Sequence, residues 1–477
     1  MGDGAASDEF DVIVIGGGPA GENAAQYAIA GSDRTAALVE RELVGGECSY
    51  WACMPSKALL TPVHFLDRAR HLRGITGTGI DLDAVLARRD DFTAHHADTG
   101  QVAWAQSVGV AVIRGAGALA GDRRVRVGDR ELIARQAVVL ATGSTALIPD
   151  VPGLRAALPW ISRDVTNLRE LPRRVLILGG GVVACEAATW LSAFGAAVTM
   201  VVRGDRLLGG MEPFAGERVA SALAERGVEI RFGAGLDAVT RTSPAATGAG
   251  RIHGGPVTAT VGGTVLEADE LVVATGRAPA TAGLGLATVG LDDRAVAVDD
   301  HLTAIGVAGS WLYAVGDVTG RNLLTHMGKY QARVCGDVIA ARARGGPLDG
   351  PRYRATADHG AVPAVVFSAP EVATVGRTEQ AARTAGFTVV AVELDISVAG
   401  SALLRDDYAG HAKLVVDRST GRLLGATFVG PDVGELLQAA TVAVVGEIPV
   451  EQLWHAVPAY PTVSEVWLRL LEKLRDR

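Results

Sequence analysis

The sequence predicts an α/β fold in which two similar strand–turn–helix domains with parallel sheets are joined to an independent C-terminal α+β domain. Two glycine-rich turns support this, because each stands between a short apolar run and an alanine-rich helical segment. The pattern changes from Val362 onward, where strands follow one another and a long helix begins at about Thr462. This change predicts the separate C-terminal domain.

The first turn follows the apolar strand 11–15 and opens a helix over 22–30. Its spaced glycines allow a tight turn and let the backbone approach a pyrophosphate on the helix N-terminus. Glu40 ends the next predicted strand, where a carboxylate accepts hydrogen bonds from an adenosine ribose. The predicted contacts to this first dinucleotide are made by Gly16, Gly18, Gly21 and Glu40.

The second turn follows strand 174–178 and opens a helix that runs to about Phe194. Here Arg203 takes the place of the acid, with Arg206 nearby, and a guanidinium matches a 2'-phosphate in charge and geometry. We therefore assign FAD to the first site and NADPH to the second, with NADH as the alternative should both arginines be solvated surface charges. The second set comprises Gly179, Gly181, Arg203 and Arg206.

The two glycine-rich turns are called the first and second fingerprints below. Cys48 and Cys53 lie shortly after the first fingerprint, inside the segment 45–57. In a regular helix their alpha carbons would stand about 7.5 Å apart or more, which is too far for easy bridging. The spacing therefore predicts a distorted segment and a strained disulfide that is easily reduced. The alternative is two buried thiols.

Composition favours small-molecule chemistry. The chain carries 45 basic and 53 acidic residues, a net charge of -8, so no basic field recruits nucleic acid or an anionic membrane. No basic region precedes an apolar run in 1–10, and no run of about 18 apolar residues is present. These features predict a cytoplasmic protein whose disulfide is catalytic or sensory.

The motifs together resemble the pyridine nucleotide-disulfide oxidoreductases, which include dihydrolipoamide dehydrogenases, glutathione reductases and mercuric reductases. The resemblance covers almost the whole chain. It rests on the redox signature, on Gly316-Asp317, and on the C-terminal opening 362–367 with Pro370-Glu371; the matching signature residues are Gly45, Gly46, Cys48, Cys53, Pro55, Ser56 and Lys57. The resemblance implies a homodimeric flavoenzyme with a C-terminal dimerisation domain.

By that resemblance Cys53 faces the flavin, Cys48 attacks the substrate and Asp317 accepts a hydrogen bond from the flavin chain. Lys57 and Glu186 correspond to a lysine beside the flavin ring and a glutamate on the nicotinamide side; the alternative is a surface lysine and a helix-face acid. Two strands that end in Ala-Thr-Gly, at Gly143 and Gly276, are expected to pass beside FAD and NADPH. Cys185 and Cys335 are expected to be core thiols.

These motifs and the prolines at 149, 152 and 279 divide the chain into four segments. Residues 1–155 form the first part of the FAD domain and carry the disulfide, and residues 156–278 bind NAD(P)H. Residues 279–350 complete the FAD domain, and residues 351–477 form the dimerisation domain. The segment 242–263 is predicted to be a hairpin loop without catalytic residues.

The sequence departs from the family near its end. Many members have His-Pro-x-x-x-Glu where this chain has Tyr460-Pro461, followed at the same spacing by Glu465. A phenol titrates near 10 against about 6.5 for imidazole, so Tyr460 is expected to be a poor base. His455 is the alternative proton carrier. Mercuric reductases resemble this chain in having a tyrosine here, but the C-terminal cysteine pair that they use is missing.

Three functions are consistent with these features of the sequence. The first is an FAD-dependent reductase that passes electrons from NADPH through the Cys48–Cys53 disulfide to a small disulfide other than lipoamide. The second reduces a non-disulfide acceptor, a quinone or a metal ion. The third is a redox sensor, which would turn over slowly with every acceptor. No resident metal site is predicted.

Overall fold

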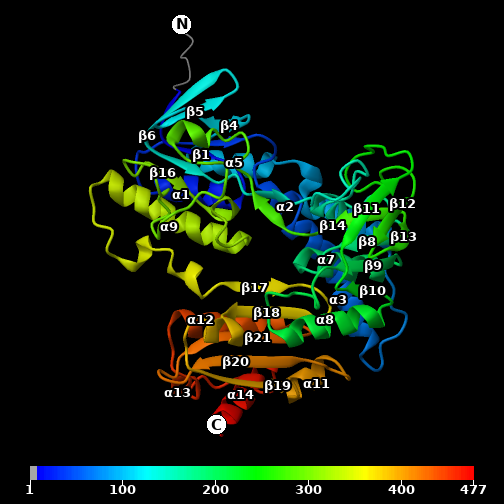
Figure 1. Cartoon of the computed structure of the whole chain (residues 1–477). Coiled ribbons are helices and arrows are strands. Elements are labelled where there is room, and N and C mark those ends of the chain that lie inside the picture. Colours follow the sequence, from blue (N-terminus) through cyan, green and yellow to red (C-terminus); the bar gives the residue numbers. More distant parts are fainter. Residues whose placement is uncertain (1–7, 477) are drawn as a thin grey trace. The chain divides into compact units, whose positions relative to one another are not determined.

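The computed structural model describes residues 8–476, and these residues form two compact units (Figure 1). Unit 1 comprises 8–54, 90–145 and 277–358, and unit 2 comprises 55–89, 146–276 and 359–476. The first seven residues, part of the segment in which no secretory signal was expected, lie outside the described residues. The finer division into four segments stays a prediction.

Unit 1 is built on a seven-stranded sheet in the order β3-β2-β1-β6-β5-β4, with β16 also paired to β6. Strands β1, β2, β3, β6 and β16 run parallel, whereas β4 and β5 are antiparallel additions. The strands are β1 (Glu9–Ile15), β2 (Ala36–Glu40), β3 (Val110–Arg114), β4 (Gly117–Leu119), β5 (Arg124–Val127), β6 (Arg130–Leu140) and β16 (Leu312–Ala314). The helices are α1 (Pro19–Ile29), α2 (Gly46–Tyr50), α5 (Thr99–Ser107) and α9 (Thr325–Ala343).

The core of unit 1 explains why its central strands read as unbroken apolar runs. Residues 12–14 of β1 are fully buried, as are residues 138–140 of β6. A parallel sheet covered on both faces excludes water from every side chain, so the alternation seen in half-exposed strands is absent. Helices α1 and α9 pack against each other beside this sheet (Figure 1).

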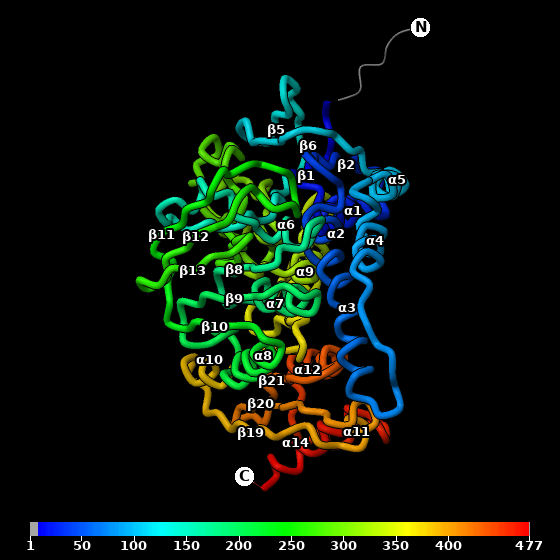
Figure 2. The backbone as a smooth tube through the Cα atoms, turned by 90° about the vertical axis from the view of Figure 1, so that its right-hand side faces the viewer, coloured from blue at the N-terminus to red at the C-terminus, as the bar shows by residue number. Residues whose placement is uncertain are grey.

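Unit 2 contains a four-stranded parallel sheet, β10-β9-β8-β14, and a three-stranded antiparallel sheet, β11-β12-β13. The parallel strands are β8 (Arg174–Leu178), β9 (Ala197–Val202), β10 (Glu229–Phe232) and β14 (Glu270–Val273). The antiparallel strands are β11 (Leu236–Arg241), β12 (Val257–Val261) and β13 (Thr264–Ala268). The helices are α6 (Ser162–Thr166), α7 (Val182–Ala193) and α8 (Pro213–Glu225), and α8 contacts both β10 and β21 (Figure 2).

The C-terminal part of unit 2 is a five-stranded antiparallel sheet in the order β17-β18-β21-β20-β19. Its strands are β17 (Pro363–Val366), β18 (Glu371–Gly376), β19 (Val389–Asp395), β20 (His411–Asp417) and β21 (Leu423–Gly430). Its helices are α10 (Glu379–Thr384), α11 (Ala399–Leu404), α12 (Leu437–Val445), α13 (Val450–Leu453) and α14 (Val466–Arg475). Four further elements lie at or across the unit boundaries: α3 (Cys53–Arg70), α4 (Leu82–Phe92), β7 (Ser144–Ala146) and β15 (Arg277–Pro279).

The predicted fold class is confirmed, and two local expectations need correction. The segment 242–263 is not all loop, because Val257–Val261 pairs with strands on both sides. The last helix begins at Val466 and follows a 3-10 turn over Val463–Glu465. Its apolar face lies against β19 and β20, so this chain covers that face itself and the helix gives no reason for a second subunit.

Among residues 8–476, no helix has the length and apolar content that crossing a membrane requires.

Candidate functional site

The two predicted redox cysteines lie together in unit 1 at a break between two helices. Cys48 is in α2, which ends at Tyr50, and Cys53 is the first residue of α3. Trp51 leaves the helical conformation with φ -127°, and this interruption provides the distortion that the spacing predicted. No disulfide joins these two cysteines in the structure. Interaction with Cys53 and burial raise the pKa of Cys48 far above its usual range.

The first fingerprint forms an open cradle above the start of α1. Gly17 N donates to Glu40 Oε2 at 2.6 Å and Glu42 N donates to Glu40 Oε1 at 2.6 Å, so the carboxylate is fixed at the end of β2. A Cβ on Gly21 would overlap the Gly16 carbonyl oxygen, whereas one on Gly18 would meet no atom nearer than 3.9 Å. Packing therefore explains Gly21, but Gly18 borders open space. That space fits the close backbone approach of a dinucleotide pyrophosphate.

Asp317 is held by two residues that the sequence reasoning missed. Ser144 Oγ donates to Asp317 Oδ2 at 2.5 Å, and Arg277 Nε donates to Ser144 Oγ at 2.7 Å. Burial raises the pKa of Asp317, while the Ser144 hydrogen bond and the Arg277 charge oppose that shift. Ser144 and Arg277 each directly follow one of the predicted Ala-Thr-Gly sequences, and that position was the signal available.

The second fingerprint lies in unit 2 and resembles the first, except that arginines stand where the first site has Glu40. A Cβ on Gly181 would meet no atom within 4 Å, so the turn again borders open space. Arg203 is exposed directly after β9, at the place that corresponds to Glu40 in unit 1. The Arg206 guanidinium donates to Gly209 O at 3.2 Å, and its buried Nε has no hydrogen-bond partner among the described residues. Both arginines thus stand at the carboxyl end of β9.

Lys57 and Glu186 form an ion pair within unit 2. Lys57 Nζ lies 2.9 Å from Glu186 Oε2 and 3.1 Å from Oε1, and the side chains are 35% and 5% exposed. Phe367 N also donates to Glu186 Oε1 at 3.0 Å, and Lys57 Nζ lies 4.7 Å from the centre of the Phe367 ring. Phe367, which directly follows β17 (Pro363–Val366), therefore helps to orient the Lys57–Glu186 pair. Phe367 stood in the C-terminal motif, but nothing in the sequence connected it to Glu186.

The structure gives Tyr460 and Glu465, the two predicted site residues near the end of the chain, different surroundings. Tyr460 is 76% exposed, and Glu465 Oε1 accepts a hydrogen bond from Arg469 at 2.6 Å. His455 is also exposed. Within one chain, the Tyr460 side chain faces solvent. The Glu465 carboxylate is hydrogen-bonded to Arg469, which lies one helical turn further along the chain.

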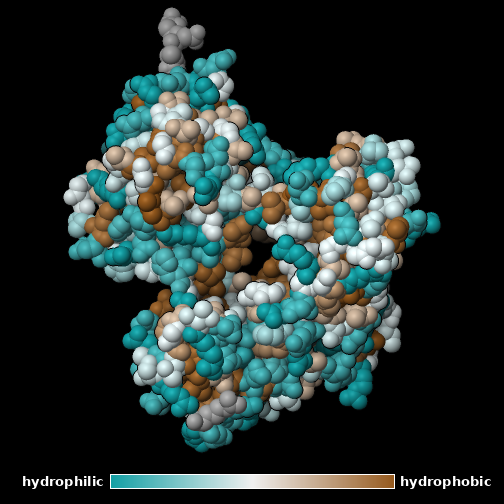
Figure 3. Space-filling model, viewed as in Figure 1, coloured by the Kyte–Doolittle hydropathy of each residue, from teal (hydrophilic) through white to brown (hydrophobic). Residues whose placement is uncertain are grey.

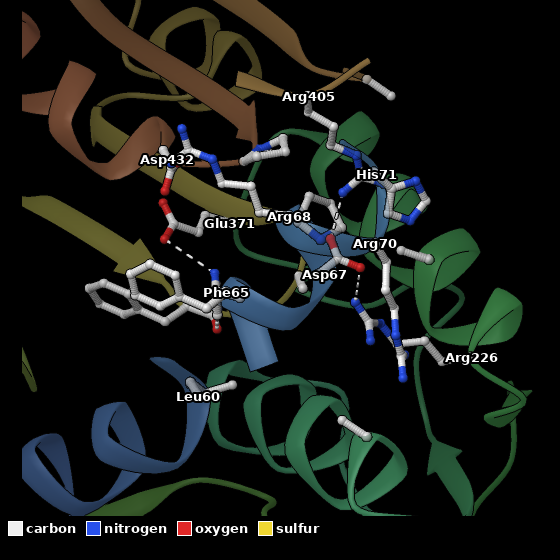
Figure 4. Close-up of a pocket in the computed structure, with 18 of the residues that line it drawn as sticks. Leu60, Phe65, Asp67, Arg68, Arg70, His71, Arg226, Glu371, Arg405 and Asp432 are labelled. Atoms are coloured by element: carbon white, nitrogen blue, oxygen red, sulfur yellow. Dashed lines mark hydrogen bonds and ion pairs between the residues drawn. The ribbon is translucent and has the colours of Figure 1, made fainter. Parts of the chain in front are cut away.

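Unit 2 also contains an open cavity of about 1060 Å³, drawn in Figure 4. Asp67 lies between Arg226, at 2.8 Å, and Arg405, at 2.5 Å, and Arg68 faces Asp432 at 3.5 Å (Figure 4). The lining of the cavity carries six Lys or Arg and five Asp or Glu side chains, so the cavity presents no strong field of a single sign to a small anion. Phe65 at its edge is 69% exposed.

Comparison with known proteins agrees with this geometry. Residues 10–339 match the model of the pyridine nucleotide-disulphide oxidoreductases, and residues 362–470 match the dimerisation domain of the same family. The dihydrolipoyl dehydrogenase of Chlamydia muridarum is 30% identical over 470 residues, covering 97% of this chain and 96% of that protein. The mercuric reductase of Staphylococcus aureus is 28% identical over 461 residues, covering 96% and 81%.

Two solved structures are also similar. The Cu(II) complex of the HOCl-induced flavoprotein disulfide reductase RclA from Escherichia coli has a TM-score of 0.82 at 25% identity, covering 98% of this chain and 99% of that chain. LpdA from Mycobacterium tuberculosis has a TM-score of 0.81 at 26% identity, covering 97% and 99%. With the Cys48–Cys53 pair and both fingerprints in place, this chain belongs to the pyridine nucleotide-disulphide oxidoreductase family of enzymes.

Proposed function

We propose that this enzyme passes electrons from NADPH through FAD to the Cys48–Cys53 pair and from there to a small disulfide. The family uses FAD and NAD(P)H. The observation that carries the proposal is the cysteine pair at a helix break, in the same unit as the open space beside Gly18. When bound, FAD supplies two-electron exchange between a hydride donor and a dithiol.

The residues for each cofactor follow from the site. Glu40 would hold the FAD ribose, the α1 N-terminus its pyrophosphate, and Asp317, fixed by Ser144, its ribityl chain. At the other fingerprint, Arg203 and Arg206 would hold the 2'-phosphate of NADPH. The Lys57–Glu186 pair would position the nicotinamide side of the reaction.

The reduction of a disulfide then balances over two exchanges. The Cys48 sulfur attacks one substrate sulfur and loses its proton, and the first substrate thiol leaves. The Cys53 sulfur next attacks Cys48, which restores the disulfide and releases the second thiol. The sum is one NADPH and one proton consumed for two thiols formed. The raised pKa of Cys48 limits the first attack, because only the thiolate is nucleophilic.

A metal ion is the second candidate acceptor. RclA, which resembles this chain over nearly its whole length, is known as a Cu(II) complex. In such a reaction two Cu(II) ions each take one electron from the dithiol, which forms a disulfide and releases two protons. This route needs no imidazole, and Tyr460 supplies none. The ion would be substrate, since residues 8–476 contain no group of three His, Cys, Asp or Glu side chains able to hold a metal.

Steady-state turnover with NADPH against a panel of disulfides, quinones and Cu(II) tests these acceptors. We expect fast turnover with one class and loss of that turnover in Cys53→Ser and Cys48→Ser. Fast turnover that survives both substitutions would contradict a route through the dithiol. Slow turnover with every acceptor would instead indicate a redox sensor.

We further propose a cytoplasmic homodimer. The dimerisation-domain match is one support. The other is α12, whose Val442 and Val445 are 52% and 59% exposed, a large apolar area for a short helix. On the face drawn in Figure 3, apolar residues are exposed among polar ones. The free thiols of Cys185 and Cys335 agree with a reducing compartment.

A further inference from the structure

Phe367 is held by three side chains of unit 2. Its backbone N–H donates to Glu186, and its ring lies beside the Lys57 ammonium. Its carbonyl oxygen lies 3.0 Å from Nε2 of His64, which stands on α3 two helical turns after Lys57. A carbonyl oxygen can only accept a hydrogen bond, so Nε2 carries the hydrogen. His64 and the Lys57–Glu186 pair therefore contact the same residue.

The His64 ring is itself oriented by an acid. Its Nδ1 lies 3.7 Å from Oε1 of Glu371, the first residue of β18. Gly434 N donates to Oε2 of the same carboxylate at 3.0 Å, which fixes the acid. Figure 4 shows Glu371 next to Arg68 and Asp432 at the cavity. Both ring nitrogens of His64 thus face a fixed partner, and this sets the orientation of the ring.

A proline interrupts the helix that carries both Lys57 and His64. Pro62 lies inside α3 between these residues and has no N–H, so the carbonyl four residues earlier loses its helical hydrogen bond. Arg88 Nη1 donates to that carbonyl at 3.1 Å instead. The backbone ladder of α3 is therefore broken at this turn. Phe367 joins the two ends of the turn, because Lys57 contacts its ring and His64 its carbonyl.

We propose that His64 is a positioning residue for flavin reduction, the step in which NADPH gives a hydride to FAD and leaves as NADP⁺. His64 acts through Phe367, whose carbonyl it holds while Glu186 holds the N–H. Without the His64 donor, Phe367 shifts, and the Lys57–Glu186 pair shifts with it. Small displacements of positioning groups cost large factors in rate. The inference rests on the proposed role of that pair on the nicotinamide side.

The test compares His64→Leu, which removes the donor, with His64→Gln, whose amide nitrogen still donates to the Phe367 carbonyl. In anaerobic holoenzyme we expect the limiting rate of flavin reduction by NADPH to fall about tenfold in the leucine variant and to stay near the wild-type rate in the glutamine variant. Electron transfer from the reduced enzyme to its acceptor should be unchanged in both. His64→Ala is the second removal variant. His71→Leu is the matched control, because His71 directly follows α3 and faces Asp407 at 2.7 Å.

Two further readouts separate positioning from a general loss of stability. One is hydrogen exchange at the Phe367 amide of the holoenzyme, measured by mass spectrometry without NADPH. We expect this exchange to be about tenfold faster in His64→Leu and unchanged in His64→Gln and His71→Leu. The other is the double variant His64→Leu with Glu186→Gln. It should reduce flavin no more slowly than Glu186→Gln alone, because His64 acts through that acid.

The outcomes distinguish this inference from the proposed function. Unchanged flavin reduction in His64→Leu and His64→Ala, an equal loss in His71→Leu, or fully additive losses in the double variant would overturn the role of His64 and leave the proposed electron route standing. Wild-type holoenzyme whose flavin is reduced by neither NADPH nor NADH would overturn the proposed function, and the inference with it.

Discussion

Arg203 and Arg206 distinguish the second dinucleotide site from the first. Arg203 is exposed where unit 1 has the buried Glu40, so its guanidinium is available to a ligand. A charge-assisted contact contributes roughly 1.5 to 3 kcal/mol, so we expect kcat/KM to favour NADPH over NADH by about ten- to a hundredfold. Arg203→Glu should flatten or reverse that ratio, and Arg251→Glu, at another exposed arginine, should leave it unchanged. Equal efficiency with both cofactors in wild type would contradict the assignment.

Tyr460 tests the departure from the family. A missing general base commonly costs roughly a hundred- to ten-thousandfold, so wild type should oxidise dihydrolipoamide slowly while NADPH still reduces the flavin quickly. Tyr460→His should raise the dithiol activity. Robust wild-type turnover that Tyr460→Phe does not change would point to another proton carrier such as His455.

Glu22 makes the stability of unit 1 depend on pH. Burial raises its pKa from 4.5 to about 7, and one of its oxygens is buried with no hydrogen-bond partner among the described residues. Because the folded pKa is raised, its contribution is fully present below the unfolded value and is lost as the pH rises through about 7. Glu22→Gln should therefore stabilise the protein relative to wild type, by at most about 3 kcal/mol, at a pH of about 8 and much less at about 4. Denaturant unfolding at both values measures this, and an equal effect at both would refute it.

At the level of elements, two glycines of the first fingerprint have different roles: Gly21 is required by packing, and Gly18 is expected to be required by FAD binding. Gly18→Ala should leave the unfolding midpoint of the flavin-free protein nearly unchanged but weaken FAD binding, because the new methyl group projects into the open cradle. Gly21→Ala should lower that midpoint, since its Cβ would overlap the backbone of Gly16. Thermal unfolding and flavin fluorescence titration measure the two effects. Unchanged FAD affinity in Gly18→Ala would mean that the cradle is not the pyrophosphate site.

Most elements of the fold could be predicted because their signals are local. The buried runs of β1 and β8 and the glycine turns that follow them are visible within about twenty residues. Strand β12 was missed because its Val-Thr-Ala-Thr-Val sequence lies among glycines and prolines, and only pairing with β11 and β13 defines it. A C-terminal helix was expected from the change of pattern after Val362, but the sequence did not show that β19 and β20 cover the apolar face of α14.

At the level of the whole molecule, the exposed face of α12 tests the proposed homodimer. Val442→Glu with Val445→Glu should shift the sedimentation profile from dimer towards monomer, because charged side chains would have to be buried against the second copy. Val265→Glu alters a valine of β13 that is 61% exposed and serves as the control. A wild type that is a fully active monomer would contradict the homodimer.

The sequence by itself determined the family, the two dinucleotide fingerprints and the redox pair, because tight turns and cysteine spacing depend on residues that are neighbours in the chain. Only the tertiary structure showed three hydrogen-bond contacts between distant parts of the chain. They join Thr325 to Cys53, Ser144 to Asp317 and Phe367 to Glu186, across separations of 272, 173 and 181 residues. Such contacts leave no periodicity or motif in one sequence, since they arise when distant strands and helices pack around one core. The motifs thus identified the reacting groups, and the fold supplied the side chains that hold their charges and protons in place.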